Sequence, residues 1–184
     1  YDGRGTIGLP MEELHDAIRN VPKPVIARVQ GYAIGGGNVL ATICDLTVCS
    51  EKAIFGQVGP KMGSVDPGYG TAFLARVVGE KKAREIWYLC RRYSAQEALA
   101  MGLVNAVVPL KDLTSTVDTY AQRLIENGPL ALRAVKELAI RSQSVPLDGK
   151  SNMRLRYRGP RRTFQYVSAT DVLSGGLAAD AFKD

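Results

Sequence analysis

The fold of this chain is decided by PVIARVQGYAIGGGNVLATIC, residues 24–44. The first six residues of this stretch are apolar and β-branched enough for a short buried strand. Three consecutive glycines, Gly35 to Gly37, come after it, and residues 38–44 have the pattern of a buried helix. A strand, a glycine turn and a helix in this order predict a layered α/β fold.

Periodic segments lie on both sides of this stretch. Before it, Met11, Leu14 and Ile18 recur at helical spacing, which predicts an amphipathic helix over residues 10–20. The sole histidine, His15, lies beside that apolar stripe, so we expect it at the surface. After the stretch, the patterns predict strands at 46–49, 53–55 and 104–108, a loop at 57–70, and helices at 71–78, 81–90, 95–101, 113–126 and 130–141.

The composition is that of a soluble globular protein. The chain has 184 residues, of which 46% are hydrophobic and 23% charged, enough to bury one sizeable core. No apolar run approaches the roughly 20 residues of a membrane span, and no signal pattern opens the sequence. We therefore expect a cytoplasmic protein without membrane contacts. Its three cysteines lack the spacing of a zinc site or a disulfide framework, so we expect buried, reduced thiols and no metal.

The positive charge is concentrated near the C-terminus. The formal net charge is +6, and five arginines in one short stretch account for most of it: Arg154, Arg156, Arg158, Arg161 and Arg162. No recognised nucleic-acid-binding motif accompanies them, so a solvated surface is the expected reading and nucleic acid is not an expected partner.

The triple glycine is the first candidate for chemistry. At the start of a helix the backbone N–H groups have no partners within the helix, and the helix dipole is positive there. Such a place suits a developing oxyanion, because glycine lets a ligand approach the backbone closely. A tight turn or a phosphate cradle has the same glycines, although the Gly-Lys-Ser/Thr of a P-loop is absent.

Two runs carry a specific family resemblance: PKPVIARVQGYAIGGGNVLATICDLTVCSEKAIFGQVGPKMGS, residues 22–64, and GEKKAREIWYLCRRYSAQEALAMGLVNAVVP, residues 79–109. The sequence resembles the crotonase (enoyl-CoA hydratase/isomerase) superfamily over about residues 1–140. Within it, the chain is most similar to 2-ketocyclohexanecarboxyl-CoA hydrolases and 1,4-dihydroxy-2-naphthoyl-CoA synthases. The resemblance implies a spiral of ββα units, an acyl-CoA substrate, and homotrimers that often pair into hexamers.

The family fold also implies how the chain is divided. We expect a partial ββα core over residues 1–112 and a C-terminal helical region over 113–184, in which residues 150–184 diverge from the family pattern. Divergence and a sequencing frameshift explain that last stretch equally well. Because the sequence begins with Tyr1 in a glycine-rich stretch, we expect an N-terminally truncated chain.

The resemblance implies roles for the glycine turn. Gly36 matches the family's second oxyanion N–H donor, and Gly35 and Gly37 flank it; the first donor belongs to an upstream loop that this sequence lacks. The two glutamates of the family's hydratases are matched by Val39 and Gly59. Neither can move a proton, so we do not expect hydration of an enoyl double bond.

The stretch SVDPGY, residues 64–69, supplies the candidate acid–base groups. By resemblance, Asp66 matches the essential aspartate of the naphthoyl-CoA synthases and Ser64 their substrate-orienting serine. Asp66 is otherwise an ordinary residue of an Asp-Pro turn. Tyr69 is a further candidate for substrate binding, although a packing role is the commoner one for such a tyrosine.

Some naphthoyl-CoA synthases hold bicarbonate with a Gln, a Thr and a Trp. This sequence keeps Gln57 and Trp87 but has Val58 instead of the threonine. We therefore expect no cofactor besides the CoA thioester substrate, with bicarbonate as the open alternative and a core position as the alternative for Trp87. The expected substrate-binding residues are Gly35, Gly37, Gln57, Gly59, Tyr69, Trp87 and Tyr166, the last by its place near the family's C-terminal tyrosine.

These residues favour an enzyme that works through a thioester enolate. The first expectation is hydrolytic ring opening of a cyclic β-keto acyl-CoA, 2-ketocyclohexanecarboxyl-CoA to pimeloyl-CoA, with Gly36, Asp66 and Ser64 as catalytic residues. The alternative is a ring-closing lyase, 1,4-dihydroxy-2-naphthoyl-CoA synthase. A non-catalytic or RNA-binding homologue, which would use the arginine-rich stretch, is the alternative from another class.

Overall fold

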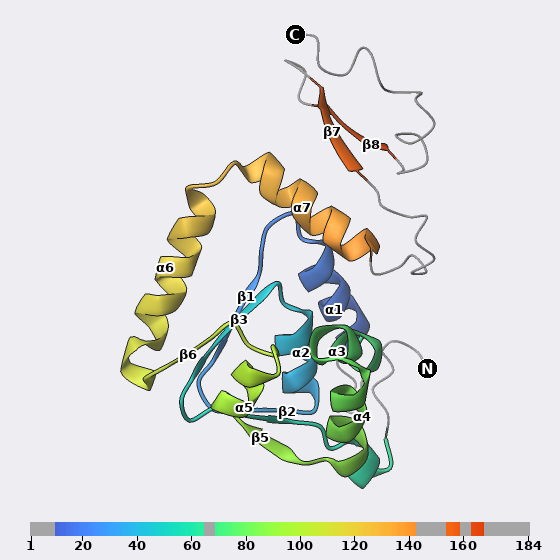
Figure 1. Ribbon diagram of the computed structural model, residues 1–184, viewed down its shortest axis with the longest axis vertical. Coiled ribbons are helices and arrows are strands. Elements are labelled where there is room, and N and C mark those ends of the chain that lie inside the picture. Colours follow the sequence, from blue (N-terminus) through green and yellow to red (C-terminus); the bar gives the residue numbers. More distant parts are fainter. Residues whose placement is uncertain (1–9, 65–68, 143–153, 159–162, 168–184) are drawn as a thin grey trace. The chain divides into compact units, whose positions relative to one another are not determined.

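The computed structural model describes residues 10–64, 69–142, 154–158 and 163–167 (Figure 1). The chain forms two compact units, residues 1–127 and 128–184. The second unit contains helix α7 (Pro129–Ser142) and an antiparallel pair of strands, β7 (Arg154–Arg158) and β8 (Thr163–Val167). The sequence patterns do not predict these two strands.

The described strands of the first unit form two small sheets. The first has the order β1-β3-β6 and is parallel throughout; the second has the order β2-β4-β5, with β2 and β4 parallel and β5 antiparallel to β4. Their bounds are β1 (Ile26–Val29), β2 (Tyr32–Ile34), β3 (Leu46–Ser50), β4 (Ile54–Gly56), β5 (Arg92–Ser94) and β6 (Ala106–Val108). Consecutive strands alternate between the sheets, β1 pairing with β3 and β2 with β4, which is the ββα repeat that the family resemblance implies.

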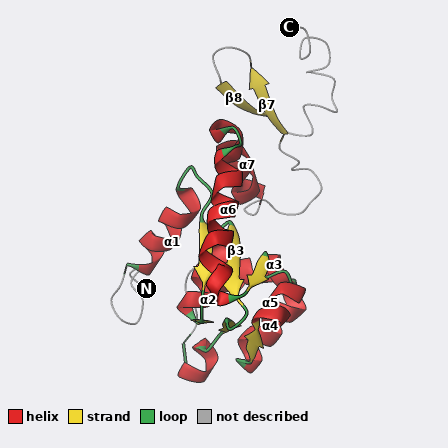
Figure 2. Cartoon of the chain, turned by 90° about the vertical axis from the view of Figure 1, so that its left-hand side faces the viewer, coloured by secondary structure: helices red, strands yellow, loops and turns green. Residues whose placement is uncertain are grey.

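Helices surround these sheets. Their bounds are α1 (Met11–Asn20), α2 (Gly36–Ile43), α3 (Gly70–Val78), α4 (Glu80–Leu89), α5 (Ala95–Ala100) and α6 (Leu113–Ile125), with 3-10 turns η1 (Gly59–Met62) and η2 (Leu110–Asp112). Helix α2 packs against α3, and α3 against α4. Helix α6 lies along β1 and β3, and Figure 2 shows it in front of β3. None of the helices in the described ranges is long and apolar enough to cross a membrane.

The core of this unit contains side chains from both sheets and from the helices, and one face of the β2-β4-β5 sheet supplies its large aromatic residues. Strand register places Ala33 beside Phe55 and Phe55 beside Tyr93. All three side chains are buried and belong to one cluster, to which α4 adds Ile86 and Trp87. Burying an aromatic or large aliphatic side chain contributes about 1.5–3 kcal/mol. The aromatic pair on β4 and β5 therefore holds the short second sheet against the helices.

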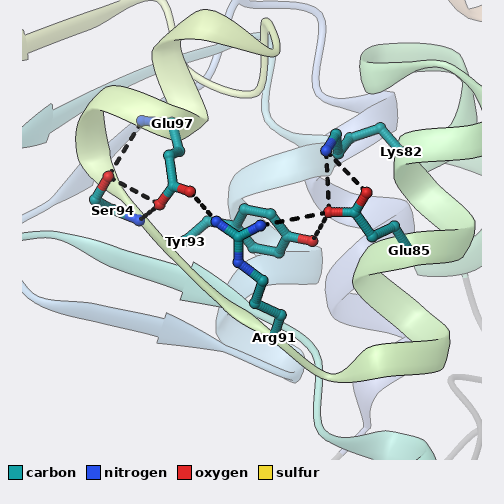
Figure 3. A network of polar contacts seen from close by, with 6 residues as sticks. All are labelled: Lys82, Glu85, Arg91, Tyr93, Ser94 and Glu97. Atoms are coloured by element: carbon teal, nitrogen blue, oxygen red, sulfur yellow. Dashed lines mark hydrogen bonds and ion pairs between the residues drawn. The ribbon is translucent and has the colours of Figure 1, made fainter.

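A capping box fixes the step from β5 into α5. The Ser94 hydroxyl accepts a hydrogen bond from the backbone N–H of Glu97, and the Glu97 carboxylate accepts one from the backbone N–H of Ser94. The Arg91 guanidinium also donates to Glu97 (Figure 3). These hydrogen bonds to Ser94 lower the pKa of Glu97. A cap of this kind contributes about 1 kcal/mol to helix stability.

The same polar network reaches α4 through a buried tyrosine. The Tyr93 hydroxyl donates to Glu85 Oε1 at 2.7 Å, and Lys82 Nζ donates to the same oxygen at 3.0 Å (Figure 3). Arg91 lies 3.7 Å from that oxygen and 4.7 Å from the centre of the Tyr93 ring. The hydrogen bond from Tyr93 lowers the pKa of Glu85. Strand β5 is thus tied to the helices on both sides of it in sequence.

This arrangement predicts a loss of stability at high pH. Burial, and then the hydrogen bond to Glu85, raise the pKa of Tyr93 from 10.0 to about 12. Since the folded pKa lies above the unfolded one, the contribution is fully present below pH 10 and is lost as the pH rises towards 12. Urea unfolding of wild type and Tyr93→Phe across this range measures it. We expect part of the wild-type decline to be absent in the variant; identical declines would contradict the role of Tyr93.

The expectation that His15 of α1 lies at the surface is wrong. His15, expected at the surface, is only 3% exposed, and Arg19, one turn further on, is 8% exposed, whereas Leu14 of the expected apolar stripe is 43% exposed. The reason is aromatic packing: Tyr69 and Phe73 lie against this face, and Arg19 stacks on their rings. The face of an aromatic ring attracts a cation, so the Arg19 guanidinium packs inward on these rings.

Candidate functional site

The glycine turn that precedes α2 is fixed by its neighbours. Gly35 has φ +57°, which favours glycine, and it occupies the N-cap position of α2. Its N–H donates to the carbonyl of Gly56 at 3.0 Å, and its own carbonyl accepts from the N–H of Val39 at 3.0 Å. The start of α2 is therefore held against the end of β4.

The next two residues of the turn leave their backbone open. Gly36 and Gly37 are exposed, and a Cβ added at either would meet no atom within 4 Å. None of the described residues accepts a hydrogen bond from their N–H groups. These donors lie at the positive end of the helix dipole, so an oxygen that becomes negative gains stabilisation there. The oxyanion role that the resemblance implies for Gly36 needs such a donor and stays a prediction.

The segment after β4 lines the other side of the turn. Gln57 is 2% exposed, and Val58 is 36% exposed. A Cβ placed on Gly35 would meet Val58 Cγ2 at 3.4 Å, so this apolar side chain borders the turn. The register of β2 with β4, which pairs Ile34 with Gly56, brings the two segments together.

Ser64 closes the turn that follows Val58. Its N–H donates to the carbonyl of Gly59 at 2.9 Å, and its hydroxyl lies 3.5 Å from the same oxygen. Between them, Gly63 has φ +67° and ends η1. Ser64 is exposed, so its hydroxyl is accessible from solvent while its backbone is fixed. The structure thus brings together two candidates, Gly59 and Ser64.

The positions that match the hydratase glutamates hold no acid–base group. Val39 is 2% exposed and apolar. At Gly59, an added Cβ would come within 2.8 Å of the Ser64 carbonyl oxygen and 3.3 Å of Trp87 Cζ3. A separation below 3.0 Å from a backbone atom requires a shift of the chain. Position 59 therefore has no room for a glutamate in this conformation.

Trp87 belongs to the core and also carries a polar atom without a partner. Its side chain is 7% exposed, and its ring lies beside Gly59. The indole Nε1 is buried and makes no hydrogen bond to the described residues. Gln57 and Trp87 would supply two of the three donors that hold bicarbonate in some synthases, and Val58 supplies none. The set does not fit the ion fully, so no step of the reaction is assigned to it.

The remaining candidates are placed as follows. Asp66 lies outside the described residues. Tyr166 lies in β8, where its backbone is opposite Leu155 of β7. The described residues contain no cluster of His, Cys, Asp or Glu suited to a metal ion. Cys44, Cys49 and Cys90 are free thiols, and burial raises the pKa of Cys49 to about 11.

Tyr69 is part of a contact that the sequence patterns do not reveal. Its hydroxyl donates to Asp16 Oδ1 of α1, and its ring lies 5.0 Å below the Arg19 guanidinium. The ring also meets Phe73 edge-on, with centroids 5.1 Å apart. Asp16 and Arg19 are 53 and 50 residues away in the sequence, so no local pattern connects them with Tyr69. The hydrogen bond to Asp16, more than burial, raises the pKa of Tyr69.

Comparison with known proteins agrees with this fold. The family model described as enoyl-CoA hydratase/isomerase matches residues 3–165. The enoyl-CoA hydratase subunit I of Geobacillus kaustophilus is 40% identical, with a TM-score of 0.67 over 72% of this chain and 52% of its own. The Bacillus anthracis enoyl-CoA hydratase is 35% identical, with a TM-score of 0.70, and the match covers 76% of this chain and 54% of that one. A monofunctional enoyl-CoA isomerase from M. smegmatis is 31% identical, with a TM-score of 0.71, and the match covers 77% of this chain and 66% of that one.

The chain therefore belongs to the crotonase, or enoyl-CoA hydratase/isomerase, family. It has the α/β crotonase fold that the sequence predicts. It spans about half the length of the two hydratases that it matches.

Proposed function

We propose that this chain acts on an acyl-CoA thioester and stabilises the thioester enolate at the start of α2. The observation that carries the proposal is the pair of exposed, unpartnered N–H groups at Gly36 and Gly37. The similar solved structures are named for enoyl-CoA substrates, which supports a CoA thioester. The absence of a carboxylate at Val39 and Gly59 argues against hydration of a double bond.

The specific reaction that we propose is hydrolytic ring opening of a cyclic β-keto acyl-CoA, such as 2-ketocyclohexanecarboxyl-CoA. Asp66 takes a proton from water, and the resulting hydroxide adds to the ring ketone, which Ser64 orients. The tetrahedral alkoxide collapses, and the bond between the ketone carbon and the α-carbon breaks. Its electron pair passes into the thioester enolate, whose oxygen accepts a hydrogen bond from the Gly36 N–H. Asp66 returns the proton to the α-carbon. The former ketone carbon becomes the carboxylic acid of pimeloyl-CoA, which loses its proton to solvent.

The second candidate is ring closure by a 1,4-dihydroxy-2-naphthoyl-CoA synthase. That reaction passes through the same kind of enolate, which attacks a carbonyl instead of being released from one. The buried, unpartnered Nε1 of Trp87 favours it, since Gln57 and Trp87 match two of the bicarbonate-holding residues of such synthases. Assembly as a homotrimer or hexamer is a further proposal from the family resemblance.

Turnover of three CoA thioesters by the complete gene product tests the assignment. The substrates are 2-ketocyclohexanecarboxyl-CoA, the open-chain keto-acyl precursor of naphthoyl-CoA, and a linear enoyl-CoA as the probe for hydration. We expect turnover of the first and essentially none of the third. Fast ring closure of the second would select the synthase. Fast hydration of the enoyl-CoA would contradict the argument that Val39 and Gly59 leave the site without the carboxylates that hydration needs.

Added bicarbonate is expected not to activate the enzyme. Val58 cannot donate the hydrogen bond of the usual threonine, and a lost hydrogen bond to a charged group costs about 1.5–3 kcal/mol, a factor of more than ten in affinity. The measurement is the initial rate against bicarbonate at constant pH and ionic strength, with chloride as the control salt. A saturable rise of several fold would mean that Gln57 and Trp87 hold the ion without the hydroxyl.

A further inference from the structure

We propose that Val58 determines which acyl group the site accepts: its side chain contacts the acyl carbons and favours a carbocyclic acyl group over a short linear one. The role rests on the proposed function, because it requires the thioester oxygen to lie at the Gly36 N–H. The place of Val58 between the end of β4 and the glycine turn carries it. The sequence patterns identify Val58 only as the residue that stands in place of a threonine.

The backbone on both sides of the Val58 side chain is fixed. Before it, the Gly56 carbonyl accepts a hydrogen bond from the Gly35 N–H at 3.0 Å. After it, the Val58 carbonyl accepts one from the Met62 N–H at 3.2 Å. Valine is branched at Cβ and has few rotamers. The side chain is therefore held in one place before any ligand binds.

That place is next to the candidate oxyanion donor. Val58 Cγ2 lies 3.4 Å from the position that a Cβ on Gly35 would take. The Gly36 N–H belongs to the planar peptide group that begins at the Gly35 Cα. An oxygen that accepts this N–H lies about 2.9 Å from the nitrogen. Because the α-carbon of the acyl group is only two bonds from that oxygen, the acyl carbons begin beside Val58.

The exposure of Val58 fits an apolar ligand. Its side chain is 36% exposed, whereas the polar Gln57 before it is 2% exposed. A ring carbon that covers Val58 removes apolar surface of both partners from water, which is favourable. The pantetheine arm of CoA contains two amides, whose polar groups would gain no hydrogen bond from a valine side chain. The carbocycle is therefore the part of the substrate that suits this contact.

The polar end of the same turn supports this direction. The Ser64 N–H donates to the Gly59 carbonyl at 2.9 Å, so the turn brings Ser64 back to the residue that follows Val58. In the proposed reaction the exposed Ser64 hydroxyl orients the ring ketone. A ring whose ketone faces Ser64 has its carbons on the side of Val58. One short segment then supplies both an apolar contact and a hydrogen bond to the same acyl group.

Binding of two unreactive acyl-CoA thioesters by the complete gene product tests the role of Val58. Cyclohexanecarboxyl-CoA has the ring but no ring ketone to attack, and acetyl-CoA has neither. Titration calorimetry measures both dissociation constants, and we expect wild type to bind the cyclic ligand more tightly. Val58→Ala removes two methyl groups, so it should weaken binding of the cyclic ligand by about tenfold and leave that of acetyl-CoA unchanged. With 2-ketocyclohexanecarboxyl-CoA as substrate, the same loss should raise KM and leave kcat unchanged.

Two further variants complete the design. Val58→Thr keeps the shape of valine and replaces one methyl group by a hydroxyl, which would lose water against the ring without gaining a partner. It should therefore also weaken binding of the cyclic ligand alone, and it replaces Val58→Ala if that variant fails to fold. Val77→Ala is the matched control, since Val77 is 40% exposed and lies in α3 outside the candidate site.

The two ligands separate the outcomes. Equal weakening of both by Val58→Ala would mean that Val58 contacts the CoA moiety, and an unchanged preference for the ring would mean that it contacts neither part. Either result would overturn the role of Val58 and leave the proposed function standing. A wild-type protein that binds neither thioester would instead overturn the proposed function itself.

Discussion

Asp66→Asn is expected to lower turnover of the cyclic β-keto acyl-CoA by about 10²- to 10⁴-fold. Asparagine keeps the shape and much of the hydrogen bonding of aspartate, but it cannot take a proton near neutral pH. Affinity for a product analogue should change little, because binding depends on other groups. The measurements are turnover, analogue affinity and melting temperature on the same preparation.

The controls separate chemistry from packing. Asp118→Asn makes the same chemical change on the exposed side of α6 and should leave all three quantities as in wild type. If Asp66 is only the aspartate of an Asp-Pro turn, the loss should appear in the melting temperature. Turnover within about threefold of wild type would remove Asp66 from the mechanism.

Gly36→Ala is expected to lower turnover without lowering stability. The added methyl group would meet no protein atom within 4 Å, and alanine is favoured over glycine in helices by up to about 1 kcal/mol. The free energy of unfolding should therefore stay constant or rise. Turnover should fall by about 10²- to 10³-fold, since the methyl group occupies the space from which the thioester oxygen reaches the N–H.

Gly31→Ala is the matched control for this substitution. Gly31 lies between β1 and β2, and an added Cβ would also meet nothing within 4 Å. It is not a candidate site residue, so both turnover and stability should resemble wild type. A Gly36→Ala variant with unimpaired turnover would show that the oxyanion is bound elsewhere.

The sequence predicts the long elements of the fold because their patterns are local. Helices α1 and α2 and strands β1 and β3 all occur within a few residues of their expected bounds. The sequence does not predict β2 or β5, although β4 and β6, also of three residues, lie within or beside expected strands. Strand β2 lies between Gly31 and Gly35 in a stretch that has the pattern of a turn. In β5 the exposed Arg92 and Ser94 flank the buried Tyr93, and only pairing with β4 makes them a strand.

The same distinction applies to the site. The glycine turn before α2 could be predicted because a strand, three glycines and a helix are contiguous, whereas its oxyanion role stays a prediction. The burial of His15 and Arg19, and the bond between Asp16 and Tyr69, depend on α1 meeting α3, which are far apart in the sequence. A periodicity argument assigns the inward face of a helix from its aliphatic residues. It therefore fails where the surface opposite that helix is aromatic.

The close approach at Gly59 has a consequence for how the family's reactions interconvert. A glutamate at this position would place its Cβ only 2.8 Å from the Ser64 carbonyl oxygen. A lineage with this turn cannot gain the carboxylate by one substitution and keep its backbone; the turn must open first, which displaces the serine. Directed evolution towards hydration should accordingly select changes in residues 60–64 before, or together with, a change at position 59.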